Sequence, residues 1–172
     1  LEEVKDLPVS EVITSSVEAL KNYSYAELSL EHVEKVKYYQ NAVKYDPKSA
    51  YFQYNLAIAY KFSADSENFK KHLDIALKYI NKLTDKHKFA VRLQIAQKDG
   101  FSFEKTSSIL NMWIELFPDD IEPYEALARF SAINGEVDKT IYYFNKILEL
   151  HPEEHQYILK IGDEYANEFD YS

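Results

Sequence analysis

The stretch HPEEH, residues 151–155, matches the H-x-x-E-H pattern of a class of zinc peptidases. In that class two histidines hold the metal and a glutamate activates a water molecule. Two histidines four residues apart can share a metal only on one helix, where they lie on the same face about 6 Å apart. Pro152 directly follows His151, however, and the residue before a proline disfavours helical geometry. We therefore predict that His151 ends one helix, where a cationic side chain suits the helix dipole, and that His155 begins the next without a metal.

The other residues with useful chemistry do not form a catalytic set. His32, His72 and His87 are scattered and lack the spacing of metal ligands. The acid pair Asp119-Asp120 is expected at a helix start, where carboxylates cap free N–H groups and complement the dipole. We predict no catalytic residue, no metal, no cofactor and no enzyme activity in this chain.

The composition excludes several classes of protein. The 172 residues contain no cysteine, which rules out disulfides, thiolate zinc sites and iron–sulfur clusters. There are 29 acidic and 20 basic side chains, for a net charge of -9, and the basic residues do not cluster in the sequence. Such a chain repels a phosphate backbone, so we predict no nucleic-acid partner. Only three glycines are present, which argues against an all-β sandwich and against a phosphate-binding glycine loop.

Membrane insertion and the cellular compartment were considered next. The longest uncharged run includes AYFQYNLAIAY, residues 50–60, which is about half the length of a membrane span and contains Gln53 and Asn55. We therefore predict no membrane insertion. Because the sequence begins at Leu1 and has no basic-then-apolar leader, we expect a fragment of a longer protein or a mature form. The cytoplasm is the favoured compartment, and the periplasm and the cell surface stay open as alternatives.

An internal repeat is visible in the positions of the prolines. Pro118 and Pro152 lie 34 residues apart, and the segments that lead to them, SILNMWIELFPDD and YYFNKILELHPEE, are alike. Pro47, in VKYDPKS, lies 71 residues before Pro118, which corresponds to two repeats with about three inserted residues. A period of this length is typical of proteins built from stacked helical repeats.

Between the prolines the pattern predicts pairs of helices. In the unit 119–152, Asp119 and Asp120 offer N-cap oxygens, Gly135 ends a first helix and Pro152 ends a second. The same pattern predicts helices over residues 15–29, 31–45, 48–63, 66–82, 85–98, 103–117, 121–134, 136–150 and 154–168. We predict an all-α fold and one domain, residues 1–172, with units 15–47, 48–83, 85–118 and 119–152 and a C-terminal capping helix 154–168.

The pattern resembles the tetratricopeptide repeat (TPR) family, whose consensus is W-x2-L-G-x2-Y, A-x3-F and a final P. The matches in the fourth unit are Tyr124, Leu127, Ala128, Phe144 and Pro152, with Ser131 in place of the tyrosine. The matches elsewhere are Tyr39, Ala42, Pro47, Leu56, Ala57, Tyr60, Leu73, Ala76, Leu93, Leu110, Pro118, Ile158, Ile161, Gly162 and Tyr165, with Gln53 in place of the first aromatic of the second unit. The resemblance implies a right-handed superhelical array of about four antiparallel hairpins and a capping helix.

A narrower resemblance lies near the N-terminus. The segment LPVSEVITSSVEALKNY, residues 7–23, and the following QNAVKYDPKSAYFQYNLAIAY are similar to the start of TPR regions in some bacterial signalling proteins. In those proteins the TPR region follows a kinase, cyclase or DNA-binding domain. The resemblance implies that this chain is a regulatory or docking region.

An array of hairpins offers a concave groove lined by the first helix of each pair. The repeat register places there Tyr51, Tyr54, Asn55, Ile58, Lys88, Val91, Arg92, Ile95, Glu125, Arg129 and Ile133. In chaperone adaptors of the family a clamp grips the terminal carboxylate of a peptide, and Asn55, Lys88 and Arg92 fall at three of its five places. Leu20 and Ser24 stand at the other two. The alternative is that Lys88 and Arg92 only solvate an exposed face or pair with neighbouring acids.

Three functions are compatible with these observations. The leading hypothesis is a protein- or peptide-binding module, the regulatory end of a bacterial signalling protein, with Tyr51, Tyr54, Asn55, Ile58, Lys88, Arg92 and Arg129 as its binding groove. The second is a secreted or lipid-anchored surface repeat protein that binds a glycan or peptide for nutrient uptake. The third is an oligomeric structural scaffold, for example a homodimer, with the terminal helix at the contact.

Overall fold

The computed structural model describes residues 13–98, 100 and 102–170, and side chains as far as residue 166 in the last helix. In this part of the chain every regular element is helical, and there are nine α-helices and one short 3-10 helix. The expected all-α fold is therefore confirmed.

The helices are arranged in two compact units that meet between residues 99 and 100. The elements of the first unit are α2 (Val17–Leu28), α3 (His32–Tyr45), α4 (Ala50–Phe62), α5 (Ser66–Lys78), η1 (Ile80–Lys82) and α6 (Asp85–Gln97). Those of the second unit are α7 (Phe103–Leu116), α8 (Ile121–Ile133), α9 (Val137–Leu150) and α10 (Gln156–Asp170). The predicted repeat 85–118 spans the boundary, so that repeat and the single domain 1–172 stay predictions.

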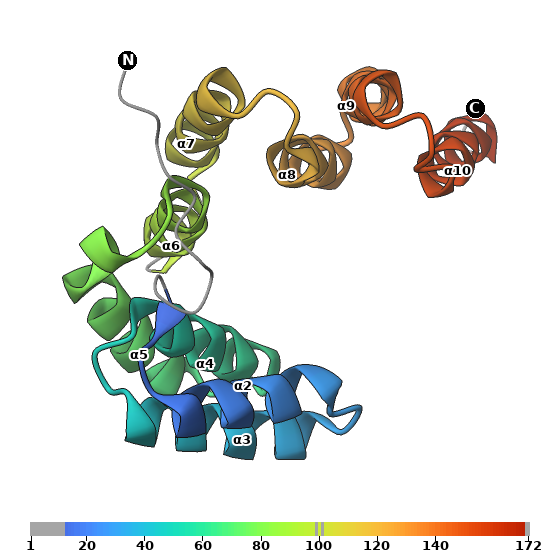
Figure 1. Ribbon diagram of the computed structural model, residues 1–172. Helices are drawn as coiled ribbons and strands as arrows, with labels where there is room; N and C mark the ends of the chain where they lie inside the picture. The colour runs from blue at the N-terminus through green and yellow to red at the C-terminus, as the bar shows by residue number, and fades with distance from the viewer. Residues whose placement is uncertain (1–12, 99, 101, 171–172) are drawn as a thin grey trace. The chain divides into compact units, whose positions relative to one another are not determined.

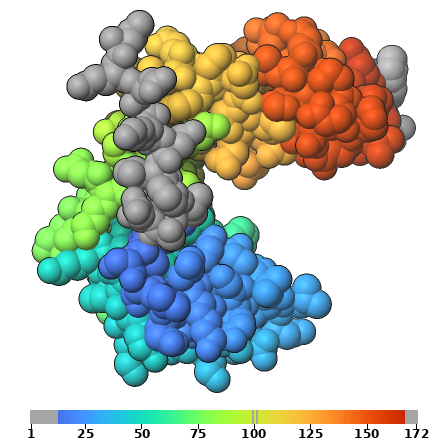
Figure 2. Space-filling model, viewed as in Figure 1, coloured from blue at the N-terminus to red at the C-terminus, as the bar shows by residue number. Residues whose placement is uncertain are grey.

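Within each unit a helix packs mainly against its neighbours in the sequence. In the second unit α8 pairs with α9, α7 packs on α8, and α10 packs on α9. Figure 1 shows α7 and α9 on one side of this unit and α8 and α10 on the other. The surface of the second unit changes colour in chain order from α7 to α10 (Figure 2). Neighbours in space are thus neighbours in sequence, as expected for a solenoid of hairpins.

The core of the first unit is built where small residues let α4 and α5 approach closely. Ala57 and Ala76 are fully buried beside Leu73, which is also fully buried. Val91 of α6 belongs to the same core and is 0% exposed, so the expectation that it faces the groove is wrong. Its side chain points inward because α6 closes this core over α5.

The core of the second unit is aromatic. Tyr124 and Ala128 of α8 pack with Phe144 and Ile147 of α9 and with Tyr157 of α10. These residues recur at the repeat spacing, and their burial explains why the sequence keeps large and small residues at fixed positions.

The turns between helices agree with the sequence in one detail and differ in another. Gly135 ends α8 with a φ of 72°, the left-handed geometry that glycine adopts without strain. Asp120 occupies the N-cap position of α8, but its carboxylate makes no capping hydrogen bond there. Its Oδ2 instead accepts a hydrogen bond from Trp113 Nε1 at 3.0 Å. The predicted cap is therefore replaced by a contact that joins α7 to the start of α8.

A search of the described helices for a membrane span found none that is long and apolar enough.

Candidate binding site

Tyr51 joins the first helices of three successive hairpins in the first unit. Its hydroxyl oxygen lies 2.9 Å from the hydroxyl oxygen of Tyr23 in α2. Its ring meets the ring of His87 in α6 edge-on, with the centroids 4.9 Å apart and an interplanar angle of 89°. The face of the first unit on which α2, α4 and α6 meet therefore exists, and Tyr51 is a structural member of it.

The other predicted groove residues of the first unit are held by local contacts. Tyr54 is half-buried against the core, and Ile58 is also half-buried. Asn55 Nδ2 donates a hydrogen bond to the Tyr51 carbonyl oxygen at 2.9 Å. Lys88 Nζ pairs with Asp85 Oδ1 at 2.8 Å.

The three predicted clamp residues are not joined to one another. Arg92 is exposed. Within the described part of the chain, no hydrogen bond or ion pair links Asn55, Lys88 and Arg92. The clamp stays a prediction.

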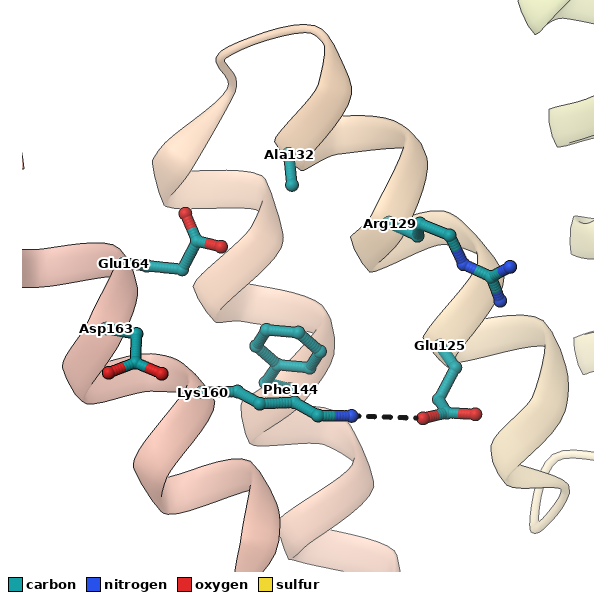
Figure 3. A pocket seen from close by; sticks show the side chains of 7 residues that line it. All are labelled: Glu125, Arg129, Ala132, Phe144, Lys160, Asp163 and Glu164. Carbon is teal, nitrogen blue, oxygen red and sulfur yellow. Dashed lines mark hydrogen bonds and ion pairs between the residues drawn. The ribbon is translucent and has the colours of Figure 1, made fainter. Parts of the chain in front are cut away.

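A pocket of about 300 Å³ lies in the second unit between α8, α9 and α10. Its lining, drawn in Figure 3, consists of Glu125, Arg129, Ala132, Phe144, Lys160, Asp163 and Glu164. Glu125 and Arg129 were predicted to face the groove from α8, and the structure brings both to this pocket. Ile133, expected beside them, is 74% exposed and lies outside the lining.

A compact polar cluster closes one end of the pocket. Glu125 Oε1 accepts a hydrogen bond from the Tyr157 hydroxyl at 2.6 Å and from Lys160 Nζ at 3.3 Å. The Lys160 ammonium lies 4.4 Å from the Tyr157 ring centroid and 5.7 Å from that of Phe144, so it also makes cation–π contacts. Burial, and then the hydrogen bond to Glu125, raises the pKa of Tyr157, which keeps the hydroxyl protonated as a donor. The charges of Glu125 and Lys160 thus satisfy each other.

Three charged groups of the pocket remain without a protein partner. Arg129 is exposed on α8, and its guanidinium extends away from α10 into open space (Figure 3). Asp163 and Glu164 project from α10. Among the described residues none of these three makes a hydrogen bond or ion pair. The pocket therefore offers one cation and two carboxylates to a ligand, with the Phe144 ring between the two walls.

The α10 side of the pocket was not foreseen from the sequence. Lys160, Asp163 and Glu164 were placed in the capping helix and given no binding role. The repeat register contained a usable signal, because the position 34 residues after Arg129 is Asp163.

The histidines of the HPEEH segment are used structurally. His151 is the C-cap of α9, and its Nε2 donates a hydrogen bond at 2.8 Å to the carbonyl oxygen of Asp119, in the preceding joint. This hydrogen bond, together with nearby Glu153, raises the pKa of His151. His155 lies just before α10, on a different element. No group of three or more His, Asp or Glu side chains that could hold a metal ion occurs in the part of the chain that the structure describes.

Comparison with known proteins places the fold. No protein-family model matches the chain. Among solved structures it is similar to MamA 41-end from Desulfovibrio magneticus RS-1, with a TM-score of 0.55 and 20% identity over 90% of this chain and 88% of that one. It is also similar to YrrB, described as a TPR protein with an unusual peptide-binding site, with a TM-score of 0.47, 20% identity and coverage of 87% and 77%.

A curated relative is the protein CTR9 homolog of Arabidopsis thaliana, which is 27% identical over 127 residues, or 68% of this chain. The chain spans only 11% of the length of that relative. The likeness to solved structures shows an all-α solenoid of helix hairpins and supports the TPR resemblance at the level of the fold.

Proposed function

We propose that this chain is a protein-interaction module that binds a peptide segment of another protein in the pocket between α8 and α10. The observation that supports the proposal is the set of three unpaired charges, Arg129, Asp163 and Glu164, around the ring of Phe144. A pocket of about 300 Å³ suits a few side chains of an extended peptide.

The charges specify the ligand further. A basic side chain of the peptide pairs with Asp163 and Glu164, and an acidic side chain or terminal carboxylate pairs with Arg129. An apolar side chain between them covers Phe144. Such a ligand is bound without any chemical step, so the chain has no catalytic role in this proposal.

The experiment uses the two arginines of the chain as a matched pair, since Arg92 and Arg129 are both exposed. The probe is a labelled heptapeptide with lysine at position two, leucine at position four and aspartate at position six, and its binding is measured by fluorescence anisotropy. An exposed charge pair contributes at most about 1 kcal/mol, so Arg129→Gln should weaken binding about fivefold. Arg92→Gln should leave the affinity unchanged.

The outcomes separate the two candidate surfaces. Equal affinities for the wild type and Arg129→Gln would remove the pocket as the site. Weakening by Arg92→Gln alone would instead favour the predicted groove of the first unit, with Tyr51, Tyr54, Asn55, Ile58 and Lys88.

The biological context of the module is a separate part of the proposal. The similarity of residues 7–23 to the start of TPR regions in bacterial signalling proteins supports a regulatory region of such a protein. Reading the gene upstream of Leu1 tests this assignment. A kinase, cyclase or helix-turn-helix domain there would support it, whereas a signal peptide would favour the surface repeat protein.

A further inference from the structure

The repeat register relates α10 to α8, in which one face is covered by a partner helix. On α8, Tyr124, Ala128 and Ser131 are 9%, 0% and 2% exposed. They are buried because α8 pairs with α9 along its length. The backbone approach is close at Ala128, whose carbonyl oxygen lies 3.5 Å from Thr140 Oγ1 of α9.

The equivalent face of α10 is uncovered in the described part of the chain. The residues 34 positions after those three are Ile158, Gly162 and Tyr165. Ile158 is 56% exposed and Tyr165 is 47% exposed. Gly162 is also exposed, and a Cβ placed on it would meet no atom within 4 Å. The face thus keeps the large–small–large pattern that receives a helix on α8, and it lacks the helix.

The helix that covers such a face has a recognisable sequence. On α9, Thr140 lies against the small residue of α8, and Phe144 and Ile147 fill the core. The same spacing occurs 34 residues earlier in α7, where Thr106, Leu110 and Trp113 are all buried. A small residue followed by large apolar residues four and seven positions later is therefore the pattern that fits this surface.

The charge of α10 selects among occupants that share this pattern. The sequence of α10 contains Lys160 against four acids, Asp163, Glu164, Glu168 and Asp170. A second copy of α10 placed across this face would bring two acidic helices together, which is unfavourable. A helix with an excess of lysine or arginine on its outer face is attracted to the same surface.

We propose that the face of α10 formed by Ile158, Gly162 and Tyr165 docks a basic amphipathic helix of a partner protein, antiparallel to α10, in the position that α9 holds on α8. This surface is distinct from the charged pocket, because Lys160 and Glu164 turn toward α8 and α9 on another side of α10. The partner is recognised by an apolar stripe of the α9 type and by its positive charge.

The probe is a labelled 14-residue peptide with the sequence of residues 137–150 in which Asp138→Lys and Glu149→Lys remove the acids. A matched acidic peptide keeps the apolar stripe and instead carries Lys139→Glu and Lys146→Glu. We expect the basic peptide to bind at least tenfold more tightly at low salt, and the difference to shrink in 0.5 M salt as the charges are screened.

The decisive variant is Gly162→Leu, which fills the centre of the face. Leucine is a better helix former than glycine, and the space at Gly162 is open, so the fold is preserved. The control Gln156→Leu places the same side chain on an exposed position elsewhere on α10. Binding of the basic peptide should weaken at least tenfold in Gly162→Leu and should not change in Gln156→Leu.

Several results would overturn the proposal. The first is unchanged binding in Gly162→Leu, and the second is equal binding of the two peptides. A dimer of the chain alone that dissociates in Gly162→Leu would assign the face to a second copy. Binding by residues 1–172 but not by a longer natural form would assign it to the chain itself. Arg129→Gln should leave this binding unchanged, which separates the outcome from that of the pocket.

Discussion

A single buried amide connects two segments of the first unit to α4. Gln53 of α4 is 2% exposed, and its Nε2 donates a hydrogen bond to the Pro47 carbonyl oxygen at 2.8 Å. Its Oε1 accepts a hydrogen bond from Nδ1 of His72 in α5 at 2.7 Å. Gln53 stands where the TPR consensus has an aromatic residue, and these two bonds explain the difference. The sequence showed the departure, but it could not show the partners, which lie 6 and 19 residues away.

The first prediction concerns this amide. Gln53→Leu keeps the approximate size of the side chain but leaves the Pro47 carbonyl and the His72 N–H without partners. Because a buried polar group without a partner costs about 1–3 kcal/mol, the free energy of unfolding should fall by this amount. Urea denaturation followed by circular dichroism measures the change. Gln40→Leu, at an exposed position, should alter stability by less than about 0.5 kcal/mol.

The second prediction concerns pH. Burial, and then the charge of Lys71, lowers the pKa of His72, while burial and Lys86 lower the pKa of His87. A histidine with a lowered pKa binds fewer protons in the folded than in the unfolded chain, so protonation favours unfolding. Stability should therefore decrease as the pH falls below about 6.5, the ordinary pKa of histidine.

Urea denaturation at pH 7.5 and pH 5.5 measures this loss. His72→Gln removes one of the two titrating groups and should reduce the loss without abolishing it. Identical losses in the wild type and the variant would contradict the role of His72.

At the scale of elements, the hydrophobic period and the prolines predicted nearly every helix to within two residues of its ends. The exception is the predicted helix 66–82, which ends at Lys78 and continues as the 3-10 helix Ile80–Lys82. No proline or glycine marks this break. It arises because Leu83 turns inward and is buried in the core of the first unit, a tertiary contact that local sequence does not reveal.

The third prediction comes from comparing two turns. Ala64 has a φ of 57° after α4 and occupies the repeat position of Gly135, 71 residues later. A residue with a Cβ is strained in this left-handed geometry, so Ala64→Gly should stabilise the protein by about 0.5–1 kcal/mol. The midpoint of urea denaturation should rise. Ala166→Gly, at an exposed position within α10, should have the opposite sign.

At the scale of the whole molecule, the sequence predicted the type of surface better than its members. The register identified Glu125 and Arg129 correctly as neighbours on one helix face. It did not identify Tyr157 and Lys160 as the partners that satisfy Glu125, because periodicity orders the residues of one helix and gives no distances between helices. The three unpaired charges of the pocket became visible only when these contacts were known.

The fourth prediction uses the two compact units, each with its own core. Trp113, the only tryptophan, is 2% exposed in the second unit and reports on that unit. Leu73→Ala creates a cavity in the first unit and should cost about 2–5 kcal/mol. Circular dichroism should then show a transition at lower urea, while the fluorescence midpoint of Trp113 stays unchanged.

The control Leu77→Ala removes the same group from a side chain of α5 that is 39% exposed, and it should have a much smaller effect. Coincident midpoints of the two signals in Leu73→Ala would show that the units unfold together.

The nearest-neighbour packing of the helices also determines how the protein responds to force. Within the second unit no described contact ties α7 to α10, and each hairpin holds only the next. Tension applied at the two ends of such a series loads its links one after another, so the weakest link yields first. The chain would then lengthen in discrete steps of about one hairpin, acting as a spring that gives way gradually instead of snapping open.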